Sequence, residues 1–151
     1  MVTDKEIELG LLKVKEVYGL AHAKRLEQLF RNETAHFKSG NFIKTLSPGM
    51  ESTKDTFPYG WSSLESFWLV NPQYKPIGVF KQVENSSALA KSRGVRSFIQ
   101  FENCIASFMS VAHLINIRGG NFGRWFATKD HPDKIAAYNN ELDKIKVRIV
   151  K

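Results

Sequence analysis

The stretch ENCIASFMSVAHLINIRGG, residues 102–120, carries the clearest helical pattern of the chain. Its apolar residues recur at the three- and four-residue spacing that gathers side chains on one helix face. These residues are Ile105, Phe108, Met109, Ala112 and Ile115. Gly119 and Gly120 follow, and glycine commonly ends a helix. The pattern predicts one helix over residues 102–116.

Two further helices are predicted near the N-terminus. Thr3 and Glu6 have the spacing of a capping box, and apolar residues at helical spacing follow for about four turns. A second helix is predicted from near Ala21, with its end between Glu33 and His36, because a cluster of turn-forming residues comes next.

The middle of the chain is predicted to be a long irregular insertion. Prolines and glycines interrupt residues 38–78 at several points, and only residues 62–70 keep a helical pattern there. Residues 77–83 and 96–101 are typical of short extended segments. A connection of this length in a small domain is usually functional.

Two elements are predicted after the long helix. Residues 122–126 are expected to form a short helix, and the last helix is expected over residues 132–147, with Pro132 in its first turn. The predicted fold class is therefore mainly α, a helical domain with a long irregular insertion that includes short β structure.

The composition is typical of one globular domain without disulfides. A chain of 151 residues, 42% hydrophobic and 25% charged, is long enough to bury its own core. The single cysteine, Cys104, excludes an internal disulfide, and its apolar surroundings in the sequence predict a buried side chain. We therefore expect residues 1–151 to form a single domain.

The formal net charge of +7 at pH 7 favours a polyanionic partner. Nucleic acid, an acidic membrane surface and the anionic polymers of a cell wall all satisfy this charge. No apolar stretch is long enough to predict a membrane span, and the N-terminus lacks a signal-peptide pattern. The sequence predicts neither a cellular location nor an oligomeric state.

One carboxylate has surroundings that favour acid catalysis. Glu33 stands at the exit of the second predicted helix, among Leu26, Leu29, Phe30 and Phe37. Apolar surroundings disfavour the ionised carboxylate and raise its pKa. A glutamate that stays protonated near neutral pH can donate a proton to a departing oxygen, as the cleavage of a glycosidic bond requires.

Several short motifs resemble the lysozyme-like superfamily. Residues 116–120, 124–126 and 136–139 (NIRGG, RWF and AAYN), together with Glu33-Thr34, are similar to motifs of its lytic transglycosylases. Residues 33–42 and 121–125 are also similar to its bacterial and phage glucosaminidases. Two patterns of the family are missing: the chain has no Gly-Leu-Met-Gln, and Asn140-Glu141 stands where Ala-Gly is usual.

The resemblance implies a lysozyme-like fold and cleavage of the β-1,4-linked glycan strands of bacterial peptidoglycan. It implies that Glu33 is the general acid and later the base. Thr34 is then expected to steady the carboxylate or the substrate, and Tyr138 to bond near Glu33 or to the sugar. Asn139 is expected on the substrate side, and the sequence itself favours His36 as a packing or substrate-side residue. From sequence alone, Tyr138 is equally well interpreted as a core aromatic residue. The resemblance leaves open which glycosidic bond is cut, and whether water or the sugar itself attacks.

The insertion supplies further candidates for a glycan groove. Glu51 and Asp55, and also Glu65, are candidates for a second carboxylate, although each is more typical of a solvated surface residue. Tyr59 and Trp61 lie beside Pro58 and Gly60 in a turn, where their rings would be exposed to sugars.

Other functions are less consistent with the sequence. Glu33 and His36 have the spacing of di-iron ligands, but the chain has no second Glu-x-x-His, so no metal site is expected. The glycines at 119, 120 and 123 lack the Lys-Ser/Thr of a phosphate-binding loop, and no cofactor is expected.

The main alternative is a non-enzymatic basic domain that binds nucleic acid or a cell-wall polymer. Five basic residues fall at the end of the chain, namely Lys134, Lys144, Lys146, Arg148 and Lys151, and a second cluster comprises Lys91, Arg93 and Arg96. No helix-turn-helix, zinc or RNP pattern indicates specific recognition of nucleic acid.

Overall fold

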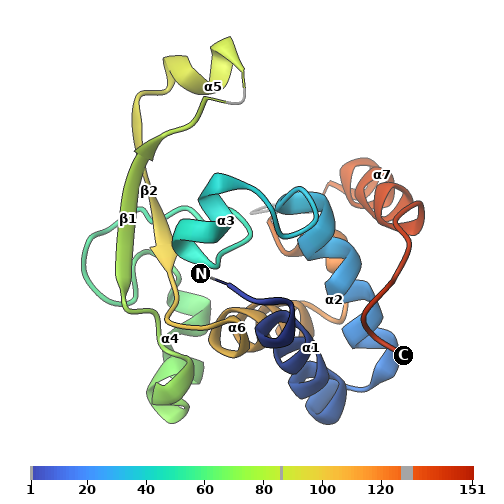
Figure 1. Ribbon diagram of the computed structural model, residues 1–151. Coiled ribbons are helices and arrows are strands. Elements are labelled where there is room, and N and C mark those ends of the chain that lie inside the picture. The colour runs from blue at the N-terminus through green and yellow to red at the C-terminus, as the bar shows by residue number, and fades with distance from the viewer. Residues whose placement is uncertain (1, 86, 127–130) are drawn as a thin grey trace.

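The computed structural model, which describes residues 2–85, 87–126 and 131–151, confirms a mainly helical fold (Figure 1). Its α-helices are α1 (Asp4–Tyr18), α2 (Leu20–Glu33), α3 (Gly40–Thr45), α4 (Ser62–Val70), α5 (Ala88–Ser92), α6 (Cys104–Ile117) and α7 (Pro132–Asp143). The strands are β1 (Gly78–Val83) and β2 (Val95–Gln100), and the 3₁₀ turns are η1 (Pro72–Tyr74) and η2 (Phe122–Arg124).

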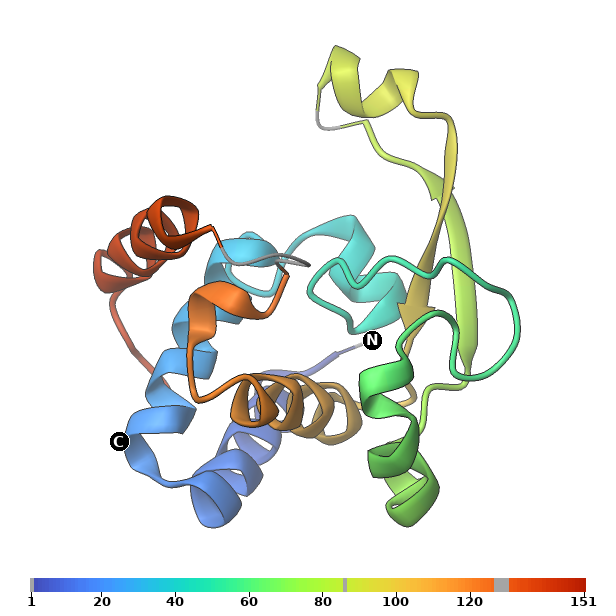
Figure 2. The same ribbon diagram turned by 180° about the vertical axis from the view of Figure 1, so that it is seen from behind.

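Helix α6 forms the centre of the core, as its strong apolar pattern suggests. Side chains all around it are buried, and not only those of the predicted face, because α1, α2 and α4 surround it (Figure 2). Gly10 of α1 lies so close that a Cβ there would stand 2.6 Å from the Phe108 ring. On another side, the Trp68 indole of α4 donates a 2.8 Å hydrogen bond to Ser110.

The first two helices confirm the predicted boundaries. The Thr3 hydroxyl caps α1 by accepting the Glu6 N–H. Helix α2 ends at Glu33, and the next residues turn the chain sharply, because Ala35, His36 and Phe37 all have positive φ. Glu33 therefore occupies the last helical position before the chain changes direction.

The insertion contains more helix than the sequence predicts. Residues 40–45 were expected to form part of a turn region but form α3, which begins where the Ser39 hydroxyl accepts the Phe42 N–H. The short helix α5 lies between the two strands and was not predicted either. The predicted helix over 62–70 is confirmed as α4.

The two extended segments pair as an antiparallel hairpin. Gly78 pairs with Gln100 at one end and Val83 with Val95 at the other. Residues 50–52 lie along the opposite edge of β2, where the Ser52 N–H donates to the Ser97 carbonyl at 2.8 Å. The hairpin and α5 extend from the helical body as an arm (Figure 1).

The end of the chain differs from the prediction. Helix α7 stops at Asp143, four residues earlier than expected, so the basic residues that follow it do not belong to a helix. Residues 144–151 instead return to α2, where buried Glu27 accepts the backbone N–H groups of Arg148, Ile149 and Val150. A carboxylate with several N–H donors holds the terminal segment in place.

Candidate active site

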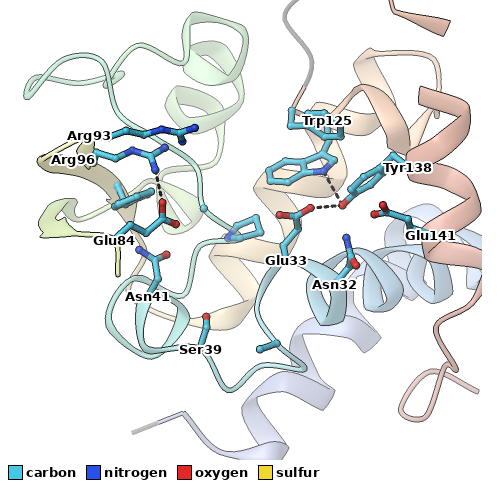
Figure 3. Close-up of a pocket in the computed structure, with 15 residues that line it drawn as sticks. Asn32, Glu33, Ser39, Asn41, Glu84, Arg93, Arg96, Trp125, Tyr138 and Glu141 are labelled. Carbon is cyan, nitrogen blue, oxygen red and sulfur yellow. Dashed lines mark hydrogen bonds and ion pairs between the residues drawn. The ribbon is translucent and has the colours of Figure 1, made fainter. Parts of the chain in front are cut away.

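A cleft of about 750 Å³ lies between the helical body and the hairpin arm (Figure 3). Residues from the end of α2, from α3, from the hairpin and from the η2–α7 region line it. They are Asn32, Glu33, Ala35, Ser39, Asn41, Pro48, Gly49, Glu84, Arg93, Arg96, Phe98, Trp125, Phe126, Tyr138 and Glu141.

Two hydrogen bonds that share the Tyr138 hydroxyl fix Glu33 in this cleft. The Tyr138 hydroxyl donates to Glu33 Oε1 at 2.7 Å, and the Trp125 indole N–H donates to the Tyr138 oxygen at 3.1 Å. Trp125 and Tyr138 are almost fully buried, so the donor at Glu33 has little freedom to move. The predicted neighbourhood of Tyr138 and Glu33 is therefore present.

The surroundings of Glu33 raise the pKa of its carboxyl group. Burial is the largest cause, because the protein surrounds the carboxyl group on most sides even though the residue is exposed through the open cleft. The hydrogen bonds from Tyr138 and Asn32 act in the opposite direction, and the negative charge of Glu141 adds to the rise. Burial and Glu33 also raise the pKa of Tyr138, which keeps its hydroxyl protonated as a donor.

The opposite wall of the cleft carries an ion network centred on Arg96 (Figure 3). The Arg96 guanidinium donates to both carboxylate oxygens of Glu51, at 3.0 and 2.8 Å, and also to Glu84. This pairing lowers the pKa of Glu51, chiefly through the hydrogen bonds from Arg96. The carboxylates of Glu51 and Glu84 are therefore both engaged by the same guanidinium group.

Among the residues predicted from sequence, Glu51 and Trp61 lie beside the cleft. Both line an adjoining pocket of about 580 Å³ that shares Gly49, Trp125 and Phe126 with the cleft itself. The Trp61 indole N–H donates to the Glu51 carbonyl at 2.9 Å, which fixes the ring. Two of the predicted groove residues thus belong to one extended groove.

The structure places three other predicted residues away from the cleft lining. Thr34 is buried, and its hydroxyl donates to the Phe30 carbonyl and accepts the Phe37 N–H, so it shapes the helix end and does not line the cleft. His36 is exposed beside Arg31, outside the cleft. Asn139 links α7 to the η2 turn through Asn121 and likewise lies outside.

The remaining predicted residues also lie outside the cleft and the adjoining pocket. Tyr59 packs edge-on against Phe57 at the margin of the core. Asp55 pairs with Lys81 at 3.4 Å on the exposed surface, and Glu65 is exposed on α4. The turn around Pro58 packs against the core, so the ring of Tyr59 is less exposed than the sequence predicts.

Sequence reasoning missed several residues that line the cleft. Trp125 and Phe126 stand in the RWF segment that carried part of the family resemblance, which was the one signal for them. The sequence indicates Arg96 only as part of a basic cluster, whereas its ion pairs with Glu51 and Glu84 organise one wall of the cleft. Asn41 was assigned to a turn.

Within the described part of the chain, no group of three or more metal-ligating side chains is close enough to hold an ion. In the same residues, no helix combines the length and the apolar character that a membrane span needs. Cys104 is buried as predicted, and burial raises the pKa of its thiol to about 12. Comparison of the chain with family models, with curated proteins and with solved structures found no match.

Proposed function

We propose that this protein cleaves the β-1,4-linked glycan strands of bacterial peptidoglycan, with Glu33 as the general acid. One observation carries the proposal: a carboxyl group with a raised pKa is held by a buried tyrosine in the wall of a large cleft. A raised pKa keeps part of the Glu33 population protonated at a pH where an ordinary glutamate is ionised.

In the proposed first step Glu33 protonates the oxygen that leaves the anomeric carbon. The glycosidic C–O bond breaks, its electron pair stays on the departing oxygen, and that oxygen takes the proton from Glu33. Tyr138 holds Oε1, so the transferable proton is carried by the other carboxyl oxygen. Glu33 is then a carboxylate that can accept a proton in the second step.

The second step does not depend on a free carboxylate across the cleft. Glu51 and Glu84 both bind Arg96, which makes either of them a weak nucleophile. Glu141 stands on the same side as Glu33 (Figure 3). We therefore propose that Glu33 as a base activates either water or a hydroxyl of the sugar itself, and the products distinguish the two.

The test is the release of soluble fragments from purified peptidoglycan, followed by turbidity and mass analysis. We expect Glu33→Gln to lower kcat by about 10²- to 10⁴-fold, the usual contribution of a general acid. Glu102→Gln is the matched control, because Glu102 is exposed and lies outside the cleft. Fragments lighter by one water indicate attack by the sugar, and reducing ends indicate hydrolysis.

Two results would overturn the proposal. One is a Glu33→Gln variant that retains the activity of the wild type. The other is a wild type that releases no fragments from peptidoglycan. Such a protein would instead bind peptidoglycan intact, or bind duplex DNA with an affinity that falls steeply with salt. Either binding result would favour a non-enzymatic basic domain, with the net charge of +7 as its basis.

A further inference from the structure

The outer end of the hairpin arm carries exposed apolar side chains. Figure 1 and Figure 2 both show α5 at the far end of the arm, away from the other helices. Leu89 of α5 and Val95 at the start of β2 are each 68% exposed, whereas Ala90, between them in the sequence, is buried. Val83 is also exposed, and it pairs with Val95, which places both side chains on the same face of the hairpin. We call Val83, Leu89 and Val95 the arm tip.

The arm tip adds nothing to the packing of the core. An apolar side chain stabilises a fold by leaving water, but Leu89 and Val95 remain largely in contact with water. A single exposed apolar residue is ordinary on a protein surface. Here, however, three of them lie at the end of one projecting element, where they can leave water only on contact with another molecule.

The charge around the arm tip is exclusively positive in the sequence. Residues 85–101 contain three basic residues, Lys91, Arg93 and Arg96, and no aspartate or glutamate. Arg93 and Arg96 line the cleft, and Arg96 is engaged in its two ion pairs there. Lys91 is exposed and forms no ion pair with any described residue. Its charge is therefore available to a partner outside the protein.

This combination of apolar and basic side chains distinguishes between the possible partners. A polymer of phosphate groups, such as nucleic acid, attracts Lys91 but offers no apolar contact to Leu89. A second copy of the chain carries the same basic arm and the same net charge of +7, so the two copies repel each other. The surface of an anionic lipid bilayer supplies both phosphate groups for a lysine and acyl chains for a leucine.

We propose that the arm tip docks on the surface of an anionic lipid bilayer. Leu89 and Val95 enter the boundary between headgroups and acyl chains, and Lys91 contacts the lipid phosphates. The contact is peripheral and reversible, because so few side chains take part. It does not depend on the proposed function, since none of these residues lines the cleft or the adjoining pocket.

The test is sedimentation of the whole chain with vesicles that contain phosphatidylglycerol, and with vesicles of phosphatidylcholine alone. We expect binding to the anionic vesicles, and a loss of affinity of about tenfold in Leu89→Ala, because alanine retains one of the four side-chain carbons. Lys91→Gln should cost about fivefold, the usual contribution of one cation near an anionic surface. The matched controls are Leu69→Ala, 64% exposed on α4, and Lys134→Gln, exposed on α7, which should leave the affinity unchanged.

A fluorescent probe at the arm tip tests insertion directly. Cys104 is buried, and burial raises the pKa of its thiol to about 12, so an introduced cysteine reacts selectively with a thiol dye. An environment-sensitive dye on Leu89→Cys should shift its emission to the blue on anionic vesicles, whereas the same dye on Leu69→Cys should not.

Three results would overturn the docking proposal. One is an equal shift of the dye at both positions, and another is equal binding to both kinds of vesicle. The third is an affinity for anionic vesicles that Leu89→Ala leaves unchanged while inorganic polyphosphate displaces the protein. That result would assign the basic arm to an anionic polymer. Each of the three leaves the proposed role of Glu33 untouched.

Discussion

At the scale of single residues, the proposed chemistry depends on the contact between Tyr138 and Glu33. Burial of the Glu33 carboxyl group raises its pKa, and the hydrogen bond from Tyr138 partly reverses that rise because it stabilises the ionised form. Tyr138 thus has two effects. It fixes the position of the acid, and it keeps the pKa of the acid from rising further.

Tyr138→Phe is expected to shift the pH profile. A general acid acts in its protonated form, so activity falls as the pH rises through the pKa of Glu33. Removal of the hydroxyl group takes away a donor to the carboxylate, and the pKa of Glu33 then rises further. The alkaline limb of kcat against pH should move to higher pH, and a limb that stays in place or moves to lower pH would contradict this role.

At the scale of elements, the site depends on a close contact between η2 and α7. Trp125 directly follows η2, and Tyr138 belongs to α7. A Cβ at Gly123 would stand 2.8 Å from both the carbonyl oxygen and a side-chain carbon of Ile135. Only glycine allows α7 to approach the turn this closely, and this approach brings Tyr138 to Trp125.

Gly123→Ala is therefore expected to displace α7. We expect a loss of stability of about 1–3 kcal/mol, as is usual when a methyl group is forced into a packed site. The proposed cleavage of peptidoglycan should fall as well, because Tyr138 moves with its helix. Gly40→Ala is the matched control, since a Cβ there meets no atom within 4 Å. Thermal unfolding measures the first effect, and equal melting temperatures for both variants would refute the tight contact.

At the scale of the whole molecule, the terminal segment is bound to α2 through one buried carboxylate. Glu27 is fully buried and pairs with Arg31 at 2.8 Å, besides accepting three backbone N–H groups of residues 148–150. Burial alone would raise the pKa of Glu27, but the hydrogen bonds from these backbone groups and from Arg31 outweigh it and lower the pKa. The ionised form of Glu27 thus stabilises the fold.

The contribution of Glu27 depends on pH in a definite direction. Since its pKa is lower in the folded state, its stabilising effect is present above the ordinary glutamate pKa and is lost as the pH falls through the lowered value. Glu27→Gln turns one acceptor into a donor that faces N–H groups, and we expect it to cost about 3–5 kcal/mol at neutral pH. Urea unfolding at several pH values should show that the acid-dependent loss is smaller in the variant. A loss as steep as that of the wild type would exclude this role.

Several local features could be predicted because a few neighbouring residues determine them. The cap at Thr3, the end of α2 at Glu33 and the helical character of α6 follow from spacing within a turn or two. Short helices such as α3 and α5 were missed because so few residues give no periodic signal. The role of Thr34 was also misassigned, since a hydroxyl at a helix end bonds the backbone as readily as a ligand.

The sequence by itself determined a mainly helical chain with an acid at the exit of an apolar helix. Only the tertiary structure decided what surrounds that acid, because its partner Tyr138 lies 105 residues away along the chain. It also decided that Arg96 binds Glu51 and Glu84, and that α7 ends early so that the terminal segment can reach Glu27. The physical reason is that the spacing of apolar residues indicates which side chains of an element are buried. Contacts between distant segments depend instead on how the packed helices and the hairpin meet.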